Sequence, residues 1–164
     1  LPRAADRIVE GLSQAVAYAA ERGVTVTIED FPNRLAPYAS IKQVGYLLDN
    51  VPGLQLTFDN GNWVVGGDDP AKAAQEFPGR IANAHLKDWE IDPNRGRIEL
   101  PDGTWIRGGL HGQGLLDHRA ILSALVGGGY DGTLAFEYEG PLDHCESTRQ
   151  GLAYLRQVLD EVRG

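Results

Sequence analysis

The feature that most constrains the fold is a regular alternation of helical and strand-like segments along the chain. Each strand-like segment is flanked by segments whose apolar residues recur every three to four positions, as on one face of a helix. The strand-like segments cover residues 24–30, 54–59, 80–86 and 133–138, and the helical ones cover residues 3–22, 40–50, 69–78, 116–127 and 144–163. This order predicts a parallel sheet with right-handed helical crossovers.

The strand-like segments also alternate between apolar and polar positions. In the first of them Val26 and Ile28 share one face, while Thr27 and Glu29 share the other. Such one-sided strands suit the inside of a (β/α) barrel better than a sheet that is apolar on both faces. We therefore predict an α/β fold of the TIM (β/α)8-barrel type. An eight-stranded barrel takes about 250 residues, so residues 1–164 are expected to form a single domain that is half a barrel.

Composition excludes several classes of protein. The net charge of −8 argues against a nucleic-acid partner, which needs a basic patch. There is no apolar run long enough to cross a membrane. The single cysteine, Cys145, rules out an internal disulfide, and no signal-peptide pattern is visible, so we expect a cytoplasmic protein. The chain contains no Met, which leads us to expect a piece of a longer protein.

A possible metal ligand lies at the end of each strand-like segment, on its polar face. Glu29 and Asp59 are 30 residues apart, His85 follows after 26 more, and Glu137 ends the last segment. Because the carboxyl ends of barrel strands meet at one mouth, we expect these side chains to converge. One acid at a strand end often only caps a helix, but four ligands in register favour a metal centre. Three carboxylates and one imidazole suit Mn²⁺ or Mg²⁺, with Co²⁺, Fe²⁺ or Zn²⁺ also possible.

Short motifs around these residues resemble the sugar isomerase/epimerase barrels of the xylose-isomerase-like superfamily, in the order of that family's C-terminal half. The motifs are Thr27-Ile28-Glu29-Asp30, Phe58-Asp59-Asn60-Gly61-Asn62, Ala84-His85-Leu86-Lys87-Asp88, Gly112-Gln113-Gly114, and Gly129-Tyr130-Asp131-Gly132 running into Phe136-Glu137-Tyr138. The resemblance implies that Glu29, Asp59, His85 and Glu137 are the metal ligands of strands five to eight. It also implies that Glu29 and Glu137 are the acid/base pair.

The resemblance is incomplete at two positions. The family often has a His three residues after the second ligand, where this chain has Asn62, which can hydrogen-bond a substrate oxygen but cannot titrate. Some sugar epimerases have an Arg six residues after the third ligand, where this chain has Ile91. We expect Asn62 to contact the substrate. Lys87 and Asp88 are expected to contact the substrate or to support residues that do, and Glu139 to be peripheral.

The connection between residues 88 and 114 is long for a βα loop, which is typical of a functional loop. Residues 97–100 and 104–107 flank Pro101-Asp102-Gly103 and predict a β-hairpin. Four basic side chains are candidates for holding a phosphate or carboxylate group of the substrate: Arg95, Arg97, Arg107 and His111. The alternative is a solvated hairpin whose arginines pair with surplus acids.

The function favoured by these observations is that of a divalent-metal-dependent isomerase or epimerase of a sugar, sugar phosphate or cyclitol, acting through an enediolate. A metal-dependent dehydratase or lyase of the inosose or dehydroshikimate type is the nearest alternative, because both reactions begin with proton removal beside a carbonyl. A DNA-repair enzyme similar to endonuclease IV is disfavoured, because that chemistry uses three zinc ions with many His ligands and the chain has four His.

A third hypothesis is a half barrel that binds a metal or a partner without catalysis. Its outermost strands, residues 24–30 and 133–138, would have unpaired edges, which invite association. We expect these edges to pair with a second copy of the chain or with the missing N-terminal half-barrel. The isolated piece is then expected to lack part of the substrate-binding wall, and it is doubtful as a catalyst alone.

Overall fold

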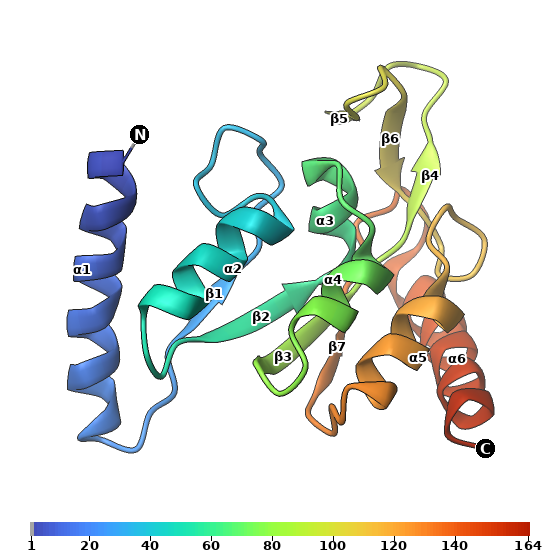
Figure 1. Cartoon of the computed structure of the whole chain (residues 1–164). Helices are drawn as coiled ribbons and strands as arrows, with labels where there is room; N and C mark the ends of the chain where they lie inside the picture. The colour runs from blue at the N-terminus through green and yellow to red at the C-terminus, as the bar shows by residue number, and fades with distance from the viewer. Residues whose placement is uncertain (1) are drawn as a thin grey trace.

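A four-stranded parallel sheet forms the centre of the protein, whose computed structural model describes residues 2–164 (Figure 1). The strands lie in the order β1-β2-β3-β7. Their bounds are β1 (Thr27–Glu29), β2 (Gln55–Asp59), β3 (Ile81–Leu86) and β7 (Leu134–Phe136). The predicted parallel α/β arrangement is confirmed.

Helices connect the strands and cover one side of the sheet. They are α1 (Pro2–Ala20), α2 (Ile41–Asn50), α3 (Asn60–Gly66), α4 (Pro70–Glu76), α5 (His118–Gly127) and α6 (His144–Arg163). Most begin at a side chain that accepts a backbone N–H of the first turn, as Ser40 does for α2 and Asp117 for α5. Helix α4 packs beside α5, and α5 beside α6 (Figure 1). Among residues 2–164, none of these helices has the length and apolarity needed to span a bilayer.

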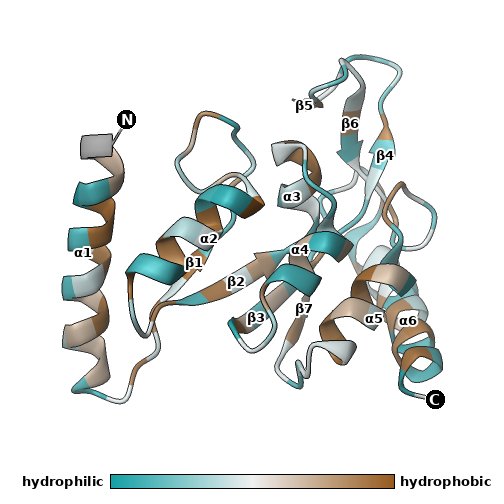
Figure 2. Cartoon of the chain, in the orientation of Figure 1, coloured by the Kyte–Doolittle hydropathy of each residue, from teal (hydrophilic) through white to brown (hydrophobic). Residues whose placement is uncertain are grey.

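The apolar faces of strands and helices meet in one core between them. Phe58 of β2, Trp63 of α3 and Phe77 after α4 are buried in contact, with ring centroids 6.2 Å apart in each adjoining pair. Apolar residues of α1 gather on its side facing the sheet, where Ile8 and Leu12 pack against the core (Figure 2). Burial of this kind is the main favourable contribution to folding.

The long loop forms a small antiparallel sheet above the ends of the parallel strands (Figure 1). Its strands, in the order β4-β6-β5, are β4 (Trp89–Ile91), β5 (Ile98–Glu99) and β6 (Trp105–Gly108). The predicted hairpin corresponds to β5 and β6. Strand β4 was not predicted, and it pairs with β6 directly after the parallel strand β3 ends.

The outermost strands of the parallel sheet are β1 and β7, each paired on one side only within the described residues. The two expected open edges are therefore present. Strand β1 is shorter than predicted, because pairing with β2 begins at Thr27 and Val24 is 57% exposed. The polar side of this sheet carries a Thr57–Thr27 hydroxyl hydrogen bond of 2.8 Å, in accord with the predicted polar face.

Candidate metal centre

The four predicted ligands lie at the carboxyl ends of the four parallel strands. Glu29 and Asp59 end β1 and β2, His85 is the penultimate residue of β3, and Glu137 follows β7 directly. The sheet register places Asp59 beside His85 and His85 beside Ala135. Because side chains alternate along a strand, Glu137 points to the same side as Ala135. The residues therefore share one face and one end of the sheet.

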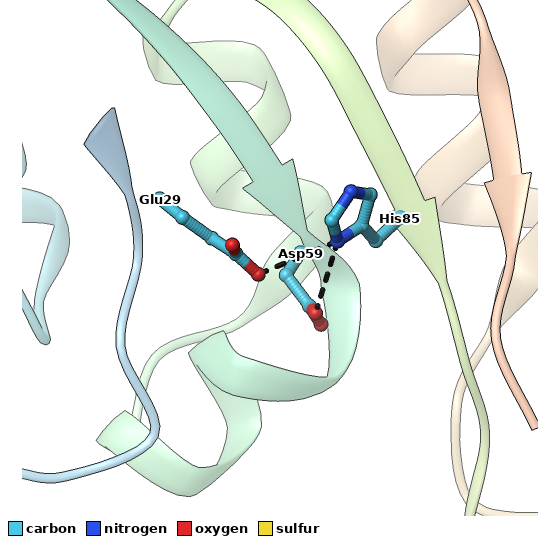
Figure 3. A group of neighbouring side chains, drawn as sticks. All are labelled: Glu29, Asp59 and His85. Carbon is cyan, nitrogen blue, oxygen red and sulfur yellow. Dashed lines mark ion pairs between the residues drawn. The ribbon is translucent and has the colours of Figure 1, made fainter. Parts of the chain in front are cut away.

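The imidazole Nδ1 of His85 is the point on which the carboxylates converge (Figure 3). It lies 3.3 Å from Glu29 Oε1, 3.8 Å from Asp59 Oδ2 and 3.1 Å from Glu137 Oε1. One ligand atom from each of Glu29, Asp59 and His85 lies within 4.8 Å of the others. Glu137 adds a third oxygen beside the same nitrogen. The structure thus brings together the predicted ligand set.

One buried atom of this cluster, His85 Nδ1, lacks a hydrogen bond in the part of the chain that the structure describes. Burying such an atom unpaired is costly, so it calls for an explanation. Asp59 Oδ1 accepts the backbone N–H groups of Gly61 and Asn62 at 2.9 and 3.1 Å and begins α3. Asp59 thus uses one oxygen for the helix, while its Oδ2 faces His85 Nδ1 at 3.8 Å and the Lys87 ammonium at 2.9 Å. An imidazole nitrogen without a hydrogen bond, with carboxylate oxygens around it, fits a divalent metal ion.

The second ring nitrogen of His85 is held by an amide. Nε2 lies 3.0 Å from the Asn83 side-chain nitrogen, on the polar face two residues earlier in β3. An amide offers either its oxygen or its nitrogen after a rotation of half a turn. With the oxygen turned toward His85, Nε2–H donates to it and Nδ1 is left free for a metal. Outer partners of this kind orient metal-binding histidines.

Burial and the neighbouring charges of the cluster shift the pKa values of Glu29 and His85. Burial is the largest effect on Glu29 and raises the pKa of its carboxyl, with the nearby Asp59 and Glu137 charges adding to the rise. Interaction with the Asp59 carboxylate is the largest effect on His85, and with Glu137 and Glu29 it raises the imidazole pKa despite burial. A proton on either group competes with a metal ion.

Metal affinity is therefore expected to fall as the pH is lowered from 8 to 6. The raised pKa of His85 means that its proton must be displaced already near neutral pH, at a cost of about tenfold in affinity per pH unit for each proton released. Titration calorimetry with Mn²⁺ at several pH values, in two buffers of different ionisation enthalpy, measures both affinity and proton release. An affinity that stays constant between pH 8 and 6 would contradict the site.

Lys87 lies beside the ligands with its ammonium group buried. Its Nζ is 2.9 Å from both Asp59 Oδ2 and Glu137 Oε2, and 3.0 Å from Glu139 Oε1. Burial alone would lower the pKa of Lys87, but the three carboxylates outweigh it and raise the pKa above the usual range. Lys87 is therefore a fixed positive charge at the centre. Gly61 makes room for it, since a Cβ there would lie 2.4 Å from the lysine chain.

A pocket of about 270 Å³ opens next to the cluster. Its polar lining includes Asn62 and Arg97, and Trp89 and Phe31 form part of its apolar wall. The Asn62 side-chain nitrogen donates to the Asp30 carbonyl at 2.8 Å, which fixes the amide at the pocket. Asn62, Lys87 and Arg97, three of the residues expected to contact a substrate, thus line this pocket.

Two residues near the centre were not identified from the sequence as parts of it. Glu139, expected to be peripheral, lines the pocket and contacts both Lys87 and Arg97. Asp30 is fully buried and accepts the Asp59 N–H at 2.8 Å, so it holds the backbone of a ligand. Burial raises the pKa of Asp30 well above its usual value. The signals were an acid two residues after Glu137 and an acid directly after Glu29.

Asp88 has a supporting position, which is one of the two roles expected for it. Its buried carboxylate accepts the backbone N–H groups of Trp89, Gly112, Gly114 and Leu116 at 2.9–3.1 Å. These bonds hold the start and the end of the long loop together. Asp88 is thereby turned away from the pocket.

His111 also lies away from the expected site. Its ring is buried 4.3 Å from that of Phe136, on the side of the sheet that faces α6, and Nε2 is 2.8 Å from the Leu86 carbonyl. A Cβ on Gly151 of α6 would lie 3.2 Å from His111 Nδ1. The sheet therefore separates His111 from Glu137, and it packs in the core instead of binding an anion.

Two arginines of the loop lie outside the pocket as well. Arg107 pairs with Glu90 across β4 and β6 at 2.6 Å. This pairing agrees with the alternative prediction, in which arginines of the hairpin pair with acidic residues. Arg95 is exposed in the turn before β5, with a φ of 51°. Arg95 and Arg107 were predicted to hold an anionic group of the substrate, and their positions outside the pocket do not agree with that role.

The family profile described as xylose isomerase-like TIM barrel matches residues 1–158. The chain belongs to that family. Among curated proteins it is similar to an inosose dehydratase of Geobacillus thermodenitrificans (strain NG80-2), with 24% identity over 166 residues, 93% of this chain and 54% of the relative. This xylose isomerase-like chain thus spans about half the length of that relative.

Solved structures share the fold of this xylose isomerase-like chain. An L-ribulose 3-epimerase structure has a TM-score of 0.76 at 19% identity, covering 97% of this chain and 55% of its own. A xylose isomerase-like TIM barrel protein from Mycobacterium smegmatis in complex with magnesium has a TM-score of 0.76 at 18% identity, covering 100% and 53%. Four parallel strands that match about half of a TIM barrel agree with the predicted half barrel.

Proposed function

We propose that the protein moves a proton on the carbon next to the carbonyl of a sugar or cyclitol, in a divalent-metal-dependent isomerisation or epimerisation. The observation that carries the proposal is the position of Glu29 and Glu137. They come from the two outermost strands of the parallel sheet, yet both reach the same nitrogen of His85, at 3.3 and 3.1 Å. Two carboxylates that approach one centre from opposite sides suit removal and return of a proton.

Residues of the chain divide the work between binding and proton transfer. Glu29, Asp59, His85 and Glu137 would hold the cation, for which we propose Mn²⁺ or Mg²⁺ because most of the donors are carboxylate oxygens. When bound, the cation supplies Lewis-acid polarisation of the substrate's oxygens and stabilises negative charge. Glu29 lines the pocket with a partly exposed carboxylate, which places it to accept a proton from a substrate there. Asn62, at the pocket wall, is placed to hydrogen-bond a substrate oxygen.

Dehydration of an inosose-like substrate is the second candidate. Its support is that the curated relatives similar to this chain are described as inosose dehydratases. The first step is the same, because a hydroxyl group leaves only after a proton beside the carbonyl has been removed. The products differ, since dehydration releases water and epimerisation does not.

Full activity is expected to require a complete barrel. The open edges of β1 and β7 are suited to pair with a complementary half-barrel or with a second copy of the chain. The free, exposed Cys145 supports a reducing compartment such as the cytoplasm.

Exchange of the substrate's proton with solvent tests the reaction. The chain is incubated in D₂O with Mn²⁺ and a panel of ketoses and inososes. The same experiment is carried out with a longer polypeptide in which the complementary half-barrel completes the barrel. We expect metal-dependent deuterium uptake, and a loss of about 10²- to 10⁴-fold for Glu29→Gln or Glu137→Gln, measured by mass spectrometry. The exposed Glu76 gives a matched control, Glu76→Gln, with unchanged exchange.

The products separate the two candidates. Deuterium uptake with retention of the oxygen atoms supports isomerisation or epimerisation, whereas loss of one water from an inosose supports dehydration. Absence of metal-dependent exchange in a complete barrel, with every substrate of the panel, would overturn both.

A further inference from the structure

The carboxylate of Glu139 engages both of the cationic side chains that line the pocket beside the metal centre. Its Oε1 is 3.0 Å from Lys87 Nζ, and its Oε2 is 2.7 Å from Arg97 Nη1. Lys87 and Arg97 are the basic residues among those lining that pocket in the described chain. Oε2 of Glu139 thus occupies Arg97, which would otherwise attract an anion, while Oε1 adds a third carboxylate to Lys87, which Asp59 and Glu137 already neutralise.

The position of Glu139 is fixed by the packing of the long loop. Glu139 lies two residues beyond Glu137, on a segment that crosses directly over Gly108 of β6. A Cβ on Gly108 would lie 2.3 Å from the Glu139 carbonyl carbon. The glycine therefore lets the small antiparallel sheet press against this backbone. Glu139 is held between that sheet and the pocket.

The charges of the centre balance without any contribution from a substrate. Glu29, Asp59 and Glu137 carry three negative charges, which a divalent cation and the Lys87 ammonium would cancel. Glu139 and Arg97 form the remaining pair and cancel each other. A substrate with a phosphate or carboxylate group would therefore add uncompensated negative charge among four carboxylates, where like charges repel strongly.

We infer that Glu139 determines substrate specificity by keeping Arg97 occupied, so that the pocket selects uncharged polyhydroxy ketones and rejects anionic ones. This inference rests on the proposed function, and it narrows the substrate class to sugars and cyclitols without phosphate. The apolar wall of Phe31, Trp89 and Ile98 suits the C–H face of such a ring. Arg97, which the sequence offered as an anion-binding group, is instead neutralised.

Sulfate binding to Glu139→Gln tests the inference without any turnover. The chain loaded with Mg²⁺ is titrated with sulfate and followed by NMR shifts of backbone amides around the pocket. Removing the carboxylate leaves the Arg97 guanidinium unpaired, and we expect sulfate to bind about two- to fivefold more tightly than to the unmodified chain. The gain stays modest because Arg97 is 67% exposed and partly screened by solvent.

Glu90→Gln is the matched control, because it frees Arg107 in the same small sheet but outside the pocket. It removes the same charge, and we expect no gain in sulfate affinity at the pocket amides. In the double variant Glu139→Gln, Arg97→Gln the gain disappears. Equal gains in Glu90→Gln and Glu139→Gln would overturn the inference, because a general charge effect would then suffice.

The Arg97 Nε–H signal of the unmodified chain keeps the test decisive if Glu139→Gln does not fold. Because the guanidinium is paired with Glu139, we expect this signal not to shift when sulfate is added; a saturable shift would identify Arg97 as an anion site and refute the inference. The outcome of the deuterium-exchange experiment is independent of the outcome of the sulfate titration. Absent exchange with the expected sulfate results refutes the reaction, whereas exchange on ketose phosphates as fast as on ketoses refutes the specificity.

Discussion

Replacing His85 with alanine is expected to remove divalent-cation binding from the chain. His85 Nδ1 is the atom around which Glu29, Asp59 and Glu137 gather, so the variant deletes the donor at the centre of the set. Three carboxylates would remain beside Lys87, which can satisfy two of them without a metal. The loss should exceed the roughly 10- to 100-fold caused by removing an outer partner of a metal ligand.

Binding of Mn²⁺ by calorimetry or by electron paramagnetic resonance measures this loss. The matched control is His144→Ala, which removes an exposed imidazole at the beginning of α6 and should leave Mn²⁺ affinity unchanged. If both variants bind Mn²⁺ as the unmodified chain does, the cluster at the strand ends is not the metal centre.

Asp88→Ala is expected to produce the largest loss of stability among the variants considered. The buried Asp88 carboxylate accepts four backbone N–H groups, three of them more than 20 residues away in sequence. A buried donor left without a partner costs about 1–3 kcal/mol. With partial rehydration of the loop, we expect the free energy of unfolding to fall by about 3–5 kcal/mol.

Urea denaturation of the two chains measures this difference. Asp102 offers a matched control, because its exposed carboxylate accepts one N–H, that of Thr104, within the turn of the hairpin. Asp102→Ala should change the unfolding midpoint little. A similar midpoint for Asp88→Ala and Asp102→Ala would mean that the loop does not depend on Asp88.

The ligands could be predicted from the sequence because strand geometry determines their positions. Alternation along each strand selects the face, and the parallel order brings equivalent ends together, so Glu29, Asp59 and His85 follow from pattern alone. The same rule extends to Glu139, which is two residues after Glu137 and on the same side. Carrying the alternation one step further would have placed it at the centre.

Residues beyond the strand ends could not be placed in this way. Asp88 and His111 lie in the long loop, where direction depends on tertiary contacts such as those to Gly112 and Phe136. Helix α3 was not predicted, because Gly61 and Gly66 lower helix propensity. It forms nevertheless, since Asp59 caps its first turn and Trp63 is buried in the core.

The outermost strands of the sheet also carry two of the four ligands. In most sheets the edge backbone opens first, independently of what binds elsewhere. Here a cation held by Glu29 of β1 and by Glu137 after β7 would tie the two edges to each other through His85 in the interior of the sheet. Because the cation binds when both edges are closed, its binding stabilises the closed edges, and it does so more strongly as the concentration of the cation rises. The rate of amide hydrogen exchange in β1 and β7 is then expected to fall as the concentration of the free cation rises.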